Sequence, residues 1–285
     1  MTLPLPTPLV STDWLAAHLG DSRIRVIDAS TYLTGSGRSG RDEYHTSHIP
    51  GALFADVDAL SDQSAPFPHT LPPPDVLAAR LGALGVSNEH AVVVYDGSGQ
   101  NFSAPRLWWM LRTLGHAQVA VLDGGYPKWQ TEGRPLTVEV TEHGPANYTA
   151  HFERARWRDL PAMRDNVETR SEQVVDARSP GRFAALEAEP RPGVRGGHIP
   201  GARNVHYATL VAADGTMLAA DALRERFADA GVNLNASIVG SCGSGVTACA
   251  VLLALEIAGA RRTALYDGSW TEWGSQSDTP VETGA

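Results

Sequence analysis

The chain carries an approximate copy of itself at a spacing of about half its length. Three pairs of segments match, at offsets of 150, 148 and 144 residues: "HIPGA" at 48–52 and 198–202, "VIDAS" at 26–30 with "VVDAR" at 174–178, and "VLDGGYPKW" at 121–129 with "LYDGSWTEW" at 265–273. Solenoid repeats are only 20–50 residues long, so a period this large indicates a duplicated domain.

Both copies alternate apolar, β-branched runs with helical patterns. Strands are predicted at 23–30, 91–96 and 118–125 and again at 172–179, 236–241 and 262–269; helices are predicted at 74–85, 104–115, 220–231 and 247–259. This alternation is typical of a parallel sheet with helices on both faces. We therefore predict an α/β protein with tandem domains at 1–140 and 161–285, joined by a linker at 141–160.

Composition and charge exclude several classes of binding partner and cofactor. The formal net charge is -9, which gives no electrostatic basis for binding nucleic acid. No apolar run is long enough to span a membrane, and the first residues lack the pattern of a signal peptide. Two cysteines cannot form a disulfide framework, so we expect a reducing, cytoplasmic location. No metal-binding spacing is present, and we expect neither a metal nor an organic cofactor.

Cys242 stands where a predicted strand meets a glycine-rich turn and an apolar helix, in "SCGSGVTACA". We expect Gly243 and Gly245 to allow the turn, and the backbone N–H groups up to Val246 and Thr247 to form an anion-binding nest at the helix N-terminus. Such a nest favours a thiolate, and the hydroxyl groups of Ser244 and Thr247 add donors. The alternative is an inert buried thiol, which is our expectation for Cys249 in the helix.

The first copy has Asp96 where the second has Cys242. The second copy also has four arginines before its "HIPGA" segment, at positions 178, 182, 191 and 195. We therefore predict one catalytic copy and one structural copy. The alternative is that the two copies diverged without functional consequence.

Taken together, these features resemble the two-domain rhodanese-type sulfurtransferases over residues 9–274. The loop "CGSGVTAC" is similar to that of the 3-mercaptopyruvate sulfurtransferases, whereas thiosulfate sulfurtransferases usually carry basic residues directly after the cysteine. The resemblance implies that Cys242 carries sulfur as a persulfide. It also implies that Arg182 and Arg191 bind the carboxylate and carbonyl of the donor. We expect Arg178 and Arg195 to form salt bridges on the surface.

The resemblance further implies a relay formed by the loop serine with a histidine and an aspartate from the first domain. Ser244 matches the loop position and His48 matches the "HIPG" position, with Asp42 as the candidate acid. The same motif also contains His198 in the second copy, so a packing role for His48 is the alternative.

The expected activity is transfer of sulfur from 3-mercaptopyruvate to a thiophilic acceptor (cyanide, a small thiol or reduced thioredoxin), with release of pyruvate. One alternative is a thiosulfate:cyanide sulfurtransferase. A cysteine phosphatase or arsenate reductase of similar fold would need an arginine at position 248, which is alanine. An alternative of another class is a non-enzymatic persulfide carrier or a redox-sensing protein that binds a partner.

Overall fold

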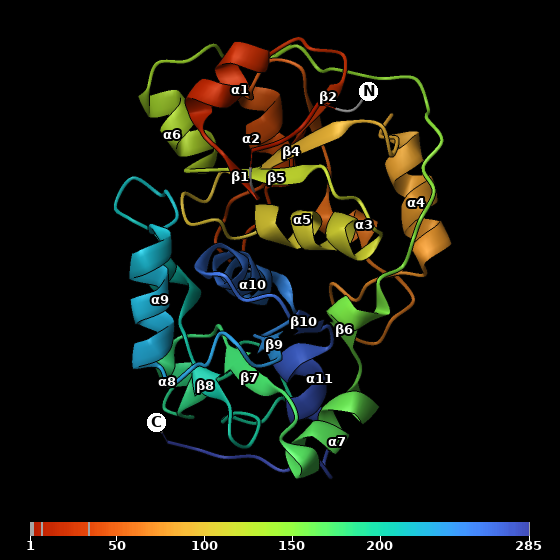
Figure 1. Ribbon diagram of the computed structural model, residues 1–285. Helices are drawn as coiled ribbons and strands as arrows, with labels where there is room; N and C mark the ends of the chain where they lie inside the picture. Colours follow the sequence, from red (N-terminus) through yellow and green to blue (C-terminus); the bar gives the residue numbers. More distant parts are fainter. Residues whose placement is uncertain (1–2, 7, 34, 285) are drawn as a thin grey trace. The chain divides into compact units, whose positions relative to one another are not determined.

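Figure 1 presents the computed structural model of the chain, which describes residues 3–6, 8–33 and 35–284. The chain forms two compact units. Unit 1 comprises Met1–Gln63, Leu71–Glu153 and Val211–Met217, and unit 2 comprises Ser64–Thr70, Arg154–Leu210 and Leu218–Ala285. Each unit contains the strands and helices of one copy of the repeat, as predicted.

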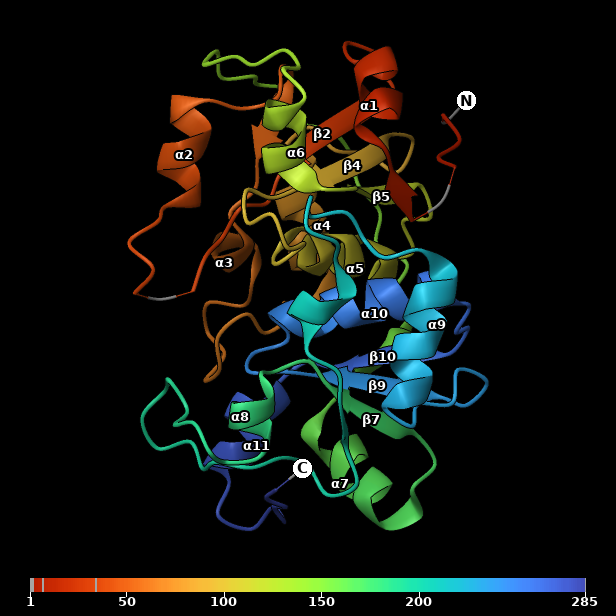
Figure 2. The same ribbon diagram turned by 90° about the vertical axis from the view of Figure 1, so that its left-hand side faces the viewer.

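Unit 1 is built on a five-stranded parallel sheet with the order β1-β5-β4-β2-β3. Its elements are β1 (Leu9–Val10), α1 (Thr12–His18), β2 (Ile24–Asp28), α2 (Gly40–Thr46), β3 (Ala52–Phe54), α3 (Val57–Leu60), α4 (Pro74–Ala83), β4 (Ala91–Tyr95), α5 (Ala104–Thr113), β5 (Val119–Leu122) and α6 (Gly125–Thr131). Helices α1 and α6 lie on one face of the sheet, and α4 and α5 lie on the other (Figures 1 and 2).

Unit 2 repeats this plan with the strand order β6-β10-β9-β7-β8, again all parallel. Its elements are η1 (Arg154–Arg156), β6 (Trp157–Arg158), α7 (Leu160–Thr169), β7 (Gln173–Asp176), α8 (Pro180–Phe183), β8 (Arg203–Asn204), η2 (Tyr207–Leu210), α9 (Ala220–Asp229), β9 (Ile238–Ser241), α10 (Val246–Ala258), β10 (Thr263–Tyr266) and α11 (Ser269–Ser275). Helices α9 and α10 cover one face, and α7 and α11 cover the other (Figures 1 and 2). The predicted α/β fold with two equivalent domains is therefore confirmed.

The central strands explain why the sequence shows continuous apolar runs here. All five residues of β4 are fully buried, because helices cover both faces of the sheet. In unit 2, Val239 of β9 belongs to a core cluster that also contains Trp270 and Trp273. Trp129 has the corresponding place in the core of unit 1. These three tryptophans are fully buried in the cores of their units.

The boundaries differ from the prediction in two ways. Unit 2 begins at Arg154, inside the expected linker, because Trp157 pairs with Leu265 at the edge of the second sheet. A strand of two residues is too short to leave a periodic signal. In addition, each copy contributes one short segment to the opposite unit: Ser64–Thr70 belongs to unit 2, and Val211–Met217 belongs to unit 1.

The two exchanged segments occupy equivalent places in the repeat, each between "HIPGA" and the ten-residue helix α4 or α9. Contacts to unit 1 hold the second of them. The Met217 N–H donates to Asp123 Oδ1 at 2.7 Å, and Lys128 Nζ lies 3.0 Å from Asp214 Oδ2. A pattern read along one copy cannot reveal such an exchange, because the partners lie in the other copy.

Asp28, at the end of β2, generates a prediction about pH. Its carboxyl group is buried, and Oδ1 accepts hydrogen bonds from the Ser30 N–H (2.9 Å) and Oγ–H (2.5 Å). Burial raises the pKa of Asp28 from 3.8 to about 6, more than the Ser30 hydrogen bonds lower it. The folded state therefore binds this proton more tightly than the unfolded state, so stability falls as pH rises from about 4 to about 6.

Asp28→Asn is expected to raise the free energy of unfolding at pH 7 by about 1–3 kcal/mol, since the amide keeps an acceptor and carries no charge. The gain should be much smaller at pH 4.5. Urea unfolding at both pH values measures this, with exposed Asp42→Asn as the control. A variant that is less stable than wild type at both pH values would contradict the assignment.

Candidate active site

Cys242 directly follows β9, and α10 begins four residues later at Val246. The thiol is 2% exposed, and its Sγ accepts the N–H of Gly245 at 3.1 Å. Backbone N–H groups at a helix N-terminus are favourable partners for a negatively charged group. Thr247 is half-buried in the first turn of the same helix. The structure thus places one backbone N–H of the loop on the sulfur, and anion binding by the loop stays a prediction.

The two glycines of the loop have different structural roles. Gly245 has φ +81°, a left-handed conformation that glycine adopts without strain. Gly243 has no positive φ, so the expectation that both glycines supply unusual backbone angles is wrong for it. A Cβ at Gly243 would lie 3.1 Å from Arg182 Nη2 and 3.9 Å from Arg191 Nη1. Its missing side chain leaves room for two guanidinium groups beside the cysteine.

The first turn of α11 holds the carbonyl groups of this loop. The Trp270 N–H donates to Cys242 O at 2.9 Å. The Thr271 N–H and Oγ–H both donate to Gly243 O, at 2.8 and 2.6 Å. Because α11 follows β10, the neighbour of β9, the loop is fixed from the next strand of the sheet.

The two arginines expected to bind the substrate are brought together. Arg182, in α8, forms a bidentate pair with Glu189: Nη2 lies 2.6 Å from Oε2, and Nε lies 3.2 Å from Oε1. Arg191 Nη1 donates to Thr271 Oγ1 at 3.4 Å. Both guanidinium groups thus lie beside Gly243 with their directions set by neighbouring side chains.

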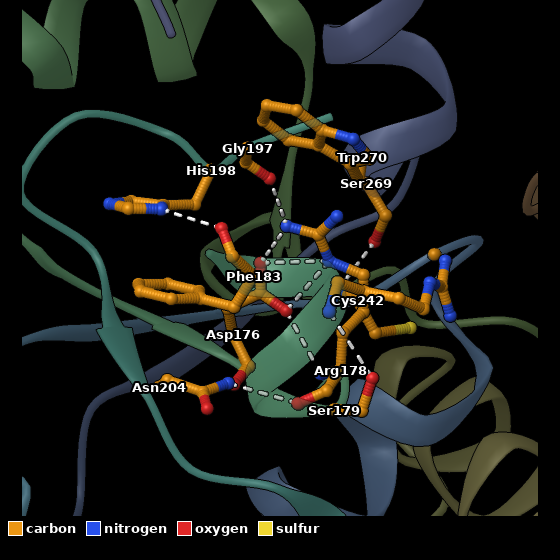
Figure 3. Close-up of polar contacts among 12 residues, drawn as sticks. Asp176, Arg178, Ser179, Phe183, Gly197, His198, Asn204, Cys242, Ser269 and Trp270 are labelled. Atoms are coloured by element: carbon orange, nitrogen blue, oxygen red, sulfur yellow. Dashed lines mark hydrogen bonds and ion pairs between the residues drawn. The ribbon is translucent and has the colours of Figure 1, made fainter. Parts of the chain in front are cut away.

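Arg178 is not on the surface, so the expectation of a surface salt bridge is wrong for it. Its side chain is 1% exposed and pairs with Asp176 at 2.7 Å and with Glu189 at 2.8 Å. It also donates to Gly197 O at 2.7 Å and lies over the Trp270 ring, 4.5 Å from its centroid (Figure 3). Burial lowers the pKa of Arg178, but Coulombic attraction to Asp176 and Glu189 and the hydrogen bonds with them together raise it above its usual value. The carboxylates on both sides offset the cost of burying this charge.

Arg195 also differs from its expected role. Its guanidinium donates to the carbonyl oxygens of Trp273, Gly274 and Thr279. It is half-buried and ties the end of α11 to the chain that follows, so it acts through main-chain hydrogen bonds.

Ser244 contacts a histidine that the sequence analysis missed. The Nδ1 of His69 lies 2.8 Å from Ser244 Oγ, within unit 2. His69 belongs to the exchanged segment Ser64–Thr70 and has φ +62°. Its only signal in the sequence is its place in the proline-rich "SAPFPHTLPPP", where the two copies no longer align.

His48 has a packing role that its counterpart shares. It is fully buried, stacks on Tyr44, and its Nδ1 and Nε2 lie 2.6 and 3.1 Å from Tyr44 O and Glu139 O. His198 likewise stacks on Phe183 and contacts Phe183 O through Nδ1 at 2.9 Å (Figure 3). The geometry therefore does not support the expected catalytic role of His48, because backbone carbonyl groups take both ring nitrogens.

Asp42, the candidate acid, lies in the exposed first turn of α2. Its backbone N–H donates to Ser39 Oγ, and its carbonyl oxygen accepts the hydroxyl of Thr46. These are contacts of a surface helix, so the geometry does not support a relay role for Asp42 either.

In the copy without a thiol, the carboxylate of Asp96 accepts the hydrogen bonds of the corresponding loop. In unit 1, Asp96 Oδ2 accepts the N–H groups of Ser103 (2.9 Å) and Ala104 (2.8 Å), and Oδ1 accepts that of Ser98 (2.9 Å). A carboxylate of the chain thus occupies the donors at the start of α5. Cys249, by contrast, is a fully buried core thiol whose Sγ donates to Gly245 O at 3.2 Å.

Among residues 3–6, 8–33 and 35–284, no group of three or more His, Cys, Asp or Glu side chains could hold a metal ion. Within the same described part of the chain, no helix is long and apolar enough to cross a membrane.

Comparison with known proteins shows the family of the chain. The model of the rhodanese-like domain matches residues 11–132 and 159–276. The 3-mercaptopyruvate sulfurtransferase of Escherichia coli K12 is 43% identical over 277 residues, covering 97% of this chain and 98% of that protein. The human 3-mercaptopyruvate sulfurtransferase is 40% identical over 270 residues, covering 93% and 91%. The mitochondrial thiosulfate/3-mercaptopyruvate sulfurtransferase 1 of Arabidopsis thaliana is 39% identical over 296 residues, covering 96% and 78%.

The solved structures agree. The crystal structure of SseA from Escherichia coli, described among 3-mercaptopyruvate sulfotransferases, matches with a TM-score of 0.84 at 40% identity. The match covers 93% of this chain and 99% of SseA.

The hydrogen bonds that Asp96 accepts in unit 1 lead to a prediction about stability. Asp96→Ala leaves three buried or half-buried N–H groups without their carboxylate, and we expect the free energy of unfolding to fall by about 1–3 kcal/mol. The alkylation rate of Cys242 by iodoacetamide should stay within about twofold of wild type, because its loop is held by unit 2 contacts. Urea unfolding and the alkylation rate test this, and undiminished stability would contradict the capping role.

Proposed function

The chain belongs to the rhodanese family and is an enzyme of the sulfurtransferase class, and from this premise we propose that it takes sulfur from 3-mercaptopyruvate. Cys242 carries the sulfur as a persulfide and passes it to a thiophilic acceptor. One observation carries the proposal: the Cys242 thiol accepts the Gly245 N–H in a loop where Arg182 and Arg191 meet across Gly243. The relatives named 3-mercaptopyruvate sulfurtransferases support this donor.

In the first step, the Cys242 thiolate attacks the sulfur of the donor. A sulfur–sulfur bond forms, the carbon–sulfur bond breaks, and its electron pair leaves on pyruvate as the enolate. A proton then adds to the enolate carbon and gives pyruvate. The outer sulfur of the persulfide can be held as an anion by the N–H groups of the loop, including those of Val246 and Thr247.

In the second step, the acceptor attacks the outer sulfur, and Cys242 leaves as a thiolate. Cyanide, a small thiol or a reduced thioredoxin has the required affinity for sulfur. Splitting one transfer into two displacements is the usual gain from covalent catalysis. The two steps balance without a metal or organic cofactor. A reducing compartment, the cytoplasm in our proposal, would preserve the free thiols.

Arg182 and Arg191 bind the carboxylate and carbonyl of the donor in this proposal. Guanidinium groups suit both a planar carboxylate and the negative charge that develops on the enolate oxygen. Gly243 and Ser244 bring no charge to the loop, whereas the dianion thiosulfate would gain from a cationic loop. This favours 3-mercaptopyruvate over thiosulfate, the alternative donor.

Ser244 and His69 form the proton-handling pair. The hydrogen bond between Ser244 Oγ and His69 Nδ1 (2.8 Å) links the cysteine loop to an ionisable ring. A histidine can hold and release a proton near neutral pH. We assign to His69 the relay role that the resemblance gave to a histidine, in place of His48.

Cys242→Ser should lower kcat/KM at least about a thousandfold with either donor, because the hydroxyl cannot form a persulfide. Cys249→Ser, the matched control in α10, should retain most of the activity. Sulfur transfer to cyanide, measured with 3-mercaptopyruvate and thiosulfate in parallel, tests this and the donor preference together. Higher kcat/KM with thiosulfate would overturn the donor, and wild-type turnover by Cys242→Ser would overturn the mechanism. A persulfide with no turnover would favour the carrier alternative.

His69→Gln should lower kcat about 10- to 100-fold with little change in melting temperature, because the half-exposed ring contributes a proton relay. His48→Gln should instead lower the melting temperature and leave kcat of the folded enzyme nearly unchanged, since its ring is buried between backbone carbonyl groups. Steady-state kinetics and thermal unfolding of both variants measure these effects. Equal kcat for His69→Gln and wild type would remove His69 from the mechanism.

A further inference from the structure

Ser269 has a backbone conformation that suits glycine. It is the first residue of α11, it is fully buried, and its φ is +50°. Residues with a Cβ rarely adopt this left-handed region, and glycine enters it freely. A strained residue beside a reactive group suggests a role that offsets the strain.

The duplicated unit supplies the comparison. The "DGG" of unit 1 aligns with the "DGS" of unit 2, so Gly125 is the counterpart of Ser269, and its φ is +57°. The next residue donates its N–H to the loop in both units: Tyr126 to Asp96 O at 3.0 Å, and Trp270 to Cys242 O at 2.9 Å. The fold therefore requires a left-handed residue here in both copies. Only the copy with the thiol meets that requirement with a serine.

The hydroxyl of Ser269 has two partners. Its Oγ–H donates to Tyr266 O at 2.8 Å. This leaves a lone pair on Oγ to accept the N–H of Cys242 at 3.2 Å, and Figure 3 labels both Ser269 and Cys242. The carbonyl of Cys242 is already held by Trp270. Both polar backbone groups of Cys242 are thus fixed by consecutive residues of α11. This sets the direction of its Cα–Cβ bond, and the sulfur at the end of that bond accepts the Gly245 N–H.

We infer that Ser269 is a positioning residue of the reaction, in which the hydroxyl orients Cys242 for attack on the donor sulfur at the expense of backbone strain. The inference rests on the proposed role of Cys242 as the sulfur carrier. Ser269 then has two separable effects. Its hydroxyl group supports the reactivity of Cys242, and its positive φ lowers only the stability of the fold.

Two variants separate these effects in a Cys249→Ser background, where alkylation reports on Cys242 alone. Ser269→Gly removes the hydroxyl and relieves the strain, and Ser269→Ala removes the hydroxyl and keeps the strain. Both should lower kcat and the rate of alkylation by iodoacetamide at pH 7 about tenfold or more, by similar factors. Their melting temperatures should differ, with Ser269→Gly about 2–4 °C above Ser269→Ala.

Gly125→Ser is the matched control. Its Cβ would lie 2.6 Å from Asp96 O, so the variant should lose stability while alkylation of Cys242 keeps its wild-type rate. Wild-type alkylation and kcat in Ser269→Gly would overturn the inference. Activities that follow melting temperature across the two Ser269 variants would show a structural role only. Alkylation needs no donor, so a wrong donor leaves this test intact, and full turnover by Cys242→Ser would instead reject the proposed function.

Discussion

The proposed site depends on three neighbouring parallel strands that end at the same edge of one sheet. Cys242 follows β9, the arginines begin after β7, and Ser269 begins the helix after β10. Since β9 lies between the other two, the loop after it receives hydrogen bonds from the β10 side and positively charged side chains from the β7 side. Trp270 and Thr271 hold the loop carbonyl groups from the β10 side, and Arg182 approaches Gly243 from the β7 side.

Buried charge then determines how the arginines are held. Arg178 can remain buried because Asp176 and Glu189 flank it, and Glu189 in turn fixes one edge of Arg182. Arg191 is held differently, by the 3.4 Å hydrogen bond from its Nη1 to Thr271 Oγ1. One of the two guanidinium groups beside Gly243 is therefore fixed by a carboxylate and the other by a hydroxyl group.

Much of this could be predicted from the sequence, and the rest could not for identifiable physical reasons. Strands covered on both faces leave continuous apolar runs, so their positions were readable. Cys242 was noticeable because only one copy has a thiol at that place, and Arg182 and Arg191 were identified through the family resemblance. His69 was not, because its segment packs in the unit of the other copy. The burial of Arg178 was also hidden, since Glu189 lies eleven residues away in a loop without periodicity.

The duplication also explains why a repeated motif was misleading as a guide to chemistry. His48 and His198 occur in both copies because each fold needs an aromatic-stacked histidine bonded to a nearby carbonyl group. What both copies share is therefore required by the fold, and what one copy alone has is free to serve the reaction. Asp96 opposite Cys242 and Gly125 opposite Ser269 are differences of that kind. In each pair the backbone has the same task, and only the side chain in unit 2 is suited to presenting a reactive sulfur.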